Sequence, residues 1–70
     1  MTQTDRVLDY LQQFGSITAL EALRDLGIMH LSSRITDMRR QGYAVKREMI
    51  EVKNRFGETT RVARYTMEAA

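Results

Sequence analysis

The sequence predicts an α+β fold in a single domain over residues 1–70, with three helices followed by a two-stranded β-hairpin. Four isolated glycines and no prolines divide the chain into segments. Apolar residues recur at helical spacing in the segments before Gly42, and strand-forming residues alternate after it. Because 70 residues enclose only one small hydrophobic core, a second domain within these residues is excluded.

The first helix is predicted over residues 3–14. Thr2 and Thr4 are both N-cap candidates, and Asp5 would lie in the first turn, where a negative charge interacts favourably with the helix dipole. Tyr10 lies off the main apolar face of this helix. That face comprises Val7, Leu8, Leu11 and Phe14.

A short second helix is predicted over residues 19–26. Thr18 and Glu21 have the spacing of a capping box, in which each side chain accepts a hydrogen bond from the backbone amide of the other residue. Gly27 would end this helix in the left-handed conformation, with the apolar side chain that follows it packed back on the helix. Residues 16–18, just before the cap, are too few to specify a strand alone, but they suit a short extra strand at a sheet edge.

The third helix is predicted over residues 31–41, ending at Gly42. Its apolar stripe is narrow and consists of Leu31, Ile35 and Met38. At 100° per residue the opposite side of the helix is small, polar and basic. The residues on this side and its flanks are Ser32, Ser33, Thr36, Asp37, Arg39 and Arg40.

After Gly42 the spacing of apolar residues changes from helical to alternating. Residues 43–53 and 60–67 are therefore predicted to form a β-hairpin around a polar turn over residues 54–58. In the first strand, apolar side chains occupy both faces, since Met49 and Ile50 have opposite parity. A β-bulge near Glu48 or Met49 would reconcile the two halves, and we expect one there.

Charge is distributed unevenly along the chain. Residues 1–28 hold two basic and four acidic residues, whereas residues 29–67 hold nine basic and four acidic residues. The net charges are therefore −2 and +5, although the whole chain carries only +2. Such asymmetry indicates contact between the basic half and a polyanion.

The order of these elements is that of a helix-turn-helix followed by a wing. The helix over residues 31–41 would enter the major groove of double-stranded DNA, and the hairpin would contact the phosphate backbone or the minor groove. The candidate DNA-binding residues on the helix are Ser32, Ser33, Thr36, Arg39 and Arg40. Those on the hairpin are Lys46, Lys53, Asn54, Arg55 and Arg61.

Several of these residues have two interpretations. Phe56, in the turn, is either an apolar wedge against DNA or a plug packed beneath its own loop, and we favour the plug. Arg34 suits a salt bridge within the domain at least as well as a DNA contact, and Asp37 would repel phosphate unless it pairs with an arginine or accepts a bond from cytosine. Ser33 and Thr36 could equally be solvent-facing residues without a contact.

Part of the hairpin charge is expected to be structural. Glu48 and Glu51 alternate with basic residues in a manner that suits cross-strand ion pairs. The basic neighbours in question are Lys46, Arg47 and Lys53. In the simplest alternative to DNA binding, the whole basic patch is a solvated surface.

Other function classes have no support in the sequence. There is no cysteine and only one histidine, His30, which we interpret as a capping or surface residue and not as a metal ligand. No nucleophile–base pair and no phosphate-binding glycine loop occurs, so we expect neither catalysis nor a cofactor or small-molecule substrate. The short apolar runs and the N-terminus lack the features of a membrane span or signal peptide, and we expect a cytoplasmic protein.

The sequence resembles small winged helix-turn-helix proteins of tailed bacteriophages and prophages. The resemblance covers about residues 4–67. It implies a winged-helix fold and DNA binding in a phage-infected or lysogenic bacterium. The stretches that carry it are Gly15-Ser16-Ile17-Thr18, Glu21-Ala22, Leu26-Gly27-Ile28, Leu31-Ser32-Ser33-Arg34-Ile35, Arg39-Arg40-Gln41-Gly42-Tyr43, Val52-Lys53-Asn54-Arg55-Phe56-Gly57 and Val62-Ala63-Arg64-Tyr65.

Two functional hypotheses follow. The first is a DNA-binding phage or prophage regulator, or an architectural factor in excision or recombination. The second is a winged-helix module that binds a host or phage protein, which an exposed apolar patch including Tyr43, Phe56 or Tyr65 would favour. A weak homodimer through Tyr10 of the first helix, or through an edge strand of the hairpin, is compatible with either hypothesis.

Overall fold

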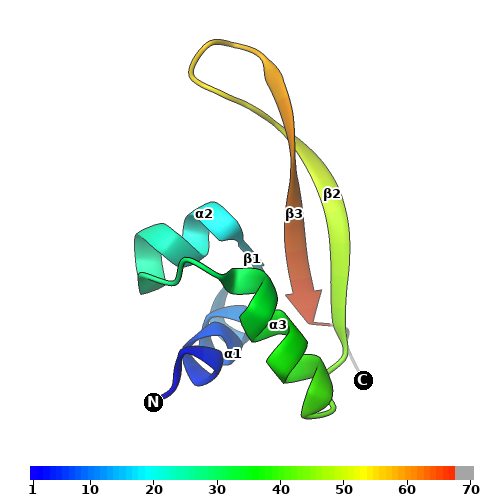
Figure 1. Cartoon of the computed structure of the whole chain (residues 1–70). Coiled ribbons are helices and arrows are strands. Elements are labelled where there is room, and N and C mark those ends of the chain that lie inside the picture. The colour runs from blue at the N-terminus through cyan, green and yellow to red at the C-terminus, as the bar shows by residue number, and fades with distance from the viewer. Residues whose placement is uncertain (68–70) are drawn as a thin grey trace.

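A computed structural model describes residues 1–67 and consists of a helical body from which a long β-hairpin projects (Figure 1). The fold is α+β, as predicted. The elements in chain order are α1 (Gln3–Phe14), β1 (Ser16–Thr18), α2 (Ala19–Glu21), the π-helical η1 (Ala22–Leu26), α3 (Leu31–Arg40), β2 (Val45–Lys53) and β3 (Thr59–Met67). We call the hairpin of β2, β3 and their connecting loop the wing.

Side chains cap the first two helices at the predicted positions. Thr2, and not Thr4, is the N-cap of α1, and it forms a capping box with Asp5 in which both hydrogen bonds are 3.1 Å. The predicted box between Thr18 and Glu21 is also present, with bonds of 2.9 and 3.3 Å. These bonds satisfy backbone amides that have no partner within the helix.

The segment α2–η1 is continuous and corresponds to the predicted second helix over residues 19–26. Gly27 ends it in the left-handed conformation, with φ of 68°. The amide of Ile28 then donates to the carbonyl of Ala22 at 3.0 Å, and the Ile28 side chain is buried, as predicted. This turn directs the chain from η1 into α3.

The ends of the later elements differ slightly from the prediction. α3 ends at Arg40 with Gln41 as its C-cap, one residue earlier than predicted. Gly42 has a φ of 98°, and the chain straightens only at Val45, so β2 begins two residues later than predicted. β3 begins at Thr59, one residue earlier than predicted.

The three strands form an antiparallel sheet in the order β1-β3-β2. β1 is the short extra strand predicted over residues 16–18, and it pairs with the end of β3, where Ile17 lies opposite Tyr65. β2 and β3 pair without interruption from Val45–Met67 to Lys53–Thr59. The expected bulge near Glu48 or Met49 is therefore absent from the sheet, and the prediction was wrong.

No bulge is needed because most of the hairpin lies outside the hydrophobic core. At Met49 and Ile50, neither face of the sheet is fully buried. Ile50 is opposite Val62 on one face and Met49 is opposite Ala63 on the other. Apolar residues can occupy both faces there, because no core requires all of them on one side.

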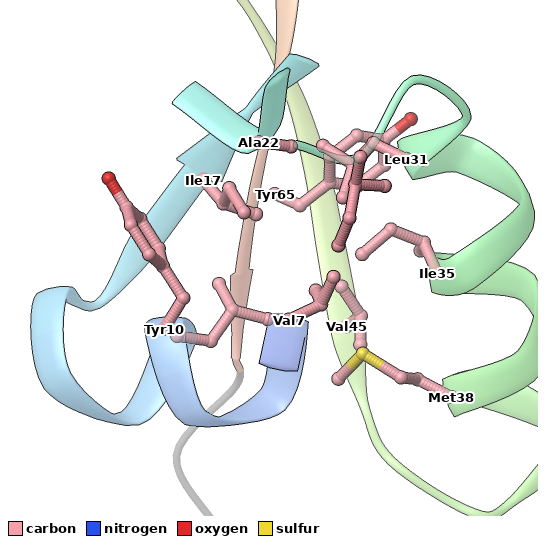
Figure 2. Packing of buried hydrophobic residues seen from close by; sticks show 11 residues of the cluster. Val7, Tyr10, Ile17, Ala22, Leu31, Ile35, Met38, Val45 and Tyr65 are labelled. Atoms are coloured by element: carbon pink, nitrogen blue, oxygen red, sulfur yellow. The ribbon is translucent and has the colours of Figure 1, made fainter. Parts of the chain in front are cut away.

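The core lies between the helices and the base of the sheet (Figure 2). Ile35 and Met38 point from α3 toward Val7 of α1 and Val45 of β2. The buried residues of the core are Val7, Tyr10, Leu11, Ile17, Ala22, Ile28, Leu31, Ile35, Met38, Val45 and Tyr65. The apolar stripe of α3 is therefore buried as predicted, and its opposite side is left exposed.

The buried stripe of α1 differs from the predicted one at two positions. Phe14 is 66% exposed, because it is the last residue of α1 and extends beyond the body. Tyr10 is buried instead, and its hydroxyl donates to Asp25 Oδ2 at 2.7 Å. The expectation that Tyr10 lies off the buried face of the helix was therefore wrong, since its ring belongs to the core, whereas a weak homodimer stays a prediction.

Candidate nucleic-acid interface

The outer side of α3 is open to solvent. Ser32, Ser33, Thr36 and Arg40 are all exposed, as the helical spacing predicts. The only hydrogen bond found for their side chains among residues 1–67 is local, from the Thr36 hydroxyl to the Ser32 carbonyl at 3.1 Å. Short side chains let a helix approach the base edges closely, and Arg40 is long enough to reach a base or a phosphate.

Asp37 is paired within its own helix. Arg34 Nη2 lies 3.4 Å from Asp37 Oδ2, and both side chains are about one-third exposed. The pairing offsets the negative charge of Asp37 on this side of the helix. It also confirms the salt-bridge interpretation of Arg34.

Arg39 links the end of α3 to the base of the wing. Its Nη2 donates to the carbonyl of Val45 at 3.0 Å. Arg39 is still exposed, and its remaining guanidinium donors can contact phosphate. The bond fixes the position of the wing relative to α3 at the point where β2 begins.

The alternation of the strands divides the basic residues of the wing between two faces. Val45 and Tyr65 point into the core, so residues of the same parity lie on the core-side face, toward the helices. The cations on this face are Arg47, Lys53 and Arg61. Lys46 and Arg64 lie on the outer face, although Lys46 was grouped with the others in the sequence analysis.

A cross-strand ion pair occupies the outer face. Glu48 and Arg64 are directly opposite in the register, and Arg64 Nε donates to Glu48 Oε1 at 3.0 Å. The Arg64 guanidinium lowers the pKa of Glu48 below its ordinary value, because the bond favours the carboxylate. Cross-strand pairing was expected for Glu48, but its partner is Arg64 and not one of the basic residues adjacent in sequence.

The loop at the tip of the wing is organised by Asn54. Its Oδ1 accepts from the amides of Phe56, at 2.9 Å, and Glu58, at 3.1 Å, and its own amide donates to the Glu58 carbonyl. Asn54 therefore shapes the loop, and only its side-chain NH₂ group remains for a partner. Phe56 is 80% exposed, so the expectation that it plugs the loop was wrong.

The structure leaves most of the predicted cations free of carboxylates. Within residues 1–67, the ion pairs involve only Arg24, Arg34 and Arg64 among the basic residues. In α3 and the wing, the exposed cations without such a partner are Arg39, Arg40, Lys46, Arg47, Lys53, Arg55 and Arg61. Arg47 was not among the candidate residues; the parity of the strand, counted from Val45, is the signal that could have found it.

The first part of the chain, whose net charge is −2 over residues 1–28, is organised by a different network. Asp25 accepts from the Tyr10 hydroxyl and from Arg24 Nε at 2.9 Å. The hydrogen bond to Asp25 raises the pKa of Tyr10 to about 12, and burial adds to this effect. The bonds from Arg24 and Tyr10 lower the pKa of Asp25. This network joins α1 to η1.

Other kinds of site have little support in the described part of the chain. Hollows of about 240 and 290 Å³ lie beside Tyr10 and beside Leu20 respectively. His30 is at the N-cap position of α3, exposed, and makes no side-chain capping bond. Over residues 1–67 there is no group of three potential metal-ligating side chains, and none of the helices is long and apolar enough to cross a membrane.

A comparison with protein families gives one match. The model of a family described as a winged helix-turn-helix domain matches residues 2–70, which is nearly the whole chain. No curated protein and no solved structure matches the chain. The family match agrees with the order of elements in the structure, from α1 through the α2–η1 and α3 pair to the wing.

Proposed function

The chain belongs to the winged helix-turn-helix family, and on that premise we propose that it reads duplex DNA with α3 and contacts the backbone with the wing. Family membership indicates DNA binding in general. The observation that supports this particular mode is the position of the unpaired cations. Arg40 is exposed on α3, and Arg47, Lys53 and Arg61 are exposed on the one face of the wing that is continuous with the core at its base.

In this proposal, α3 and the wing contact different parts of the DNA. Ser33, Thr36 and Arg40 would contact base edges, because α3 presents them without competing ion pairs. Lys53 and Arg55 would contact phosphates, because they lie near the tip of a projecting hairpin. Base contacts specify the sequence, whereas phosphate contacts supply affinity and orientation.

We further propose that the chain is a regulator or architectural factor of a phage or prophage, acting in the cytoplasm of the bacterial host. The support is the resemblance in sequence to small winged helix-turn-helix proteins of tailed phages. In this proposal the protein is not an enzyme and requires no cofactor or small-molecule substrate. One helix specifies few base pairs, so we expect a dimer or tandem sites to increase selectivity.

The test is a selection of bound sequences from a random duplex library, followed by anisotropy titration of the enriched duplex at several salt concentrations. We expect Arg40→Ala to weaken binding to the enriched duplex more than to a scrambled duplex. Lys53→Ala should weaken both equally and reduce the salt dependence. Arg6→Ala is the matched control, because it removes one exposed arginine from the acidic half of the chain. Absence of binding, or binding independent of salt, would contradict the proposal.

A protein-binding role is the second candidate, and one observation favours it. Leu20 and Leu23 are 68% and 51% exposed, and Leu20 borders the 290 Å³ hollow between α2 and the wing. Of the aromatic residues expected to form an apolar patch, however, Tyr65 is buried. If this role is correct, Leu20→Ser should abolish capture of one specific host protein from nuclease-treated lysate while leaving DNA binding unchanged.

A further inference from the structure

The tip of the wing presents an aromatic side chain to solvent. Phe56 is 80% exposed, whereas Tyr65, the other aromatic residue of the wing, is 8% exposed and belongs to the core. We propose that Phe56 is an apolar wedge that enters the minor groove of duplex DNA and partly unstacks one base step. This inference rests on the proposed function and adds to it a deformation of the DNA.

The loop holds Phe56 outward. The backbone amide of Phe56 is fixed by Asn54 Oδ1, and the adjacent Gly57 donates its amide to the Asn54 carbonyl at 3.0 Å. Gly57 has a φ of 77°, a conformation that favours glycine, so the turn after Phe56 is tight. A loop ordered in this way loses little conformational freedom when its side chain is buried by a partner.

The charged residues near Phe56 suit the binding of a nucleic acid. Arg55 is adjacent to it and Lys53 ends β2, and both are exposed without an ion pair in the described residues. Glu58 is the acidic residue of the loop, and its backbone is bonded to Asn54. An aromatic side chain preceded by two nearby cations can combine base stacking with phosphate contacts, and duplex DNA offers both.

The position of the tip favours a groove next to the one that α3 would occupy. β2 contains nine residues and therefore extends about 30 Å. Only its first residue, Val45, is buried, so the tip lies well beyond the body (Figure 1). Apolar wedges in the minor groove kink the duplex toward the major groove, and pyrimidine–purine steps unstack most easily.

The test uses the full chain with Phe56→Trp, because the protein has no other tryptophan. Two end-labelled duplexes of about two helical turns serve as probes, one containing TpA steps and one an uninterrupted A-tract. Anisotropy of the DNA label measures binding, and tryptophan emission independently measures stacking of the indole. We expect emission to be quenched on binding, more strongly with the TpA duplex.

Two controls make the result specific. Phe14→Trp places an indole at a 66% exposed position of α1, and its emission should not change on binding. Phe56→Ala should lower affinity for the TpA duplex about tenfold and reduce the bend measured by energy transfer between the duplex ends, whereas Phe56→Leu should retain much of both.

The outcomes separate the two proposals. Binding with unchanged emission at position 56, or with an equal change at position 14, would overturn the wedge and leave DNA binding intact. Absence of any anisotropy change on either duplex would overturn the proposed function and the wedge together. Binding with quenching confined to position 56 would support both.

Discussion

Apolar side chains of α3 are buried in the helical body, whereas those of the outer wing are at least partly exposed. Ile35 and Met38 of α3 are 1% and 0% exposed, whereas Met49 and Val52 of β2 are 45% and 40% exposed. The body is stabilised by burial, and the outer wing is held mainly by the backbone pairing of β2 with β3 and by cross-strand contacts. Changes to buried residues of the body should therefore act mainly on stability, and changes to the exposed cations of the wing should act mainly on binding.

The largest expected effect comes from the core. Ile35→Ala should lower the free energy of unfolding by about 3 kcal/mol, because it leaves a cavity between α3 and the sheet. Val52→Ala removes apolar atoms that are already partly exposed, and it should cost less than about 0.5 kcal/mol. Urea denaturation followed by circular dichroism measures both. Equal losses would show that the outer wing is stabilised by burial in the same way as the body.

The next largest expected effect is on the salt dependence of DNA binding, and it should differ between the two faces of the wing. Arg47→Ala removes a cation from the core-side face, and we expect it to reduce the slope of log affinity against log salt by about 1. Lys46→Ala removes a cation from the outer face and should change the slope less. Anisotropy titrations on one duplex test the pair. A larger effect of Lys46→Ala would place the outer face against DNA.

A smaller effect on stability is expected at Tyr10. Tyr10→Phe removes the hydroxyl bonded to Asp25 and should lower the free energy of unfolding by about 1 kcal/mol at neutral pH. The pKa of Tyr10 is raised to about 12 in the folded protein, so its bond stabilises the fold below pH 10 and is lost as the pH rises toward 12. The difference between the two proteins should therefore shrink in alkaline solution. A difference that persists there would assign the loss to packing of the ring.

The smallest effect concerns the ion pair of the wing. The pKa of Glu48 is lowered by Arg64, so the pair contributes stability above the ordinary glutamate pKa and loses it as the pH falls through the lowered value. Glu48→Gln should therefore be slightly less stable than the parent at neutral pH and equal to it in acid. Thermal denaturation across the acid range is the measurement. A parent that is less stable than Glu48→Gln at neutral pH would show that the pair does not contribute.

Most of the fold could be predicted from residues that lie close together in the sequence. Thr18 and Glu21 specify the start of the second helix by bonds within four residues, and Gly27 ends it by its own conformation. The stripe of α3 also followed from spacing alone. These features depend on residues close in sequence, so the sequence contains the information needed to predict them.

Features that depend on distant residues were missed. Tyr10 is buried because Asp25, on another helix, accepts its hydroxyl, and no spacing within α1 indicates that partner. The expected bulge assumed that all of β2 faces the core, but the core ends near Arg47. The kind of candidate site, and the elements that carry it, were predicted from the sequence. The finding that Lys46 and Lys53 lie on opposite faces of the wing required the register of the hairpin.

The central strand of the sheet is the last element within residues 1–67. β3 joins β1 on one side to β2 on the other, so Ile17 finds its partner only when Tyr65 has been synthesised. During synthesis the body therefore lacks part of its core until β3 has left the ribosome. A chain truncated before Tyr65 would leave Ile17 without its strand partner, so folding of the helical body depends on the second strand of the wing.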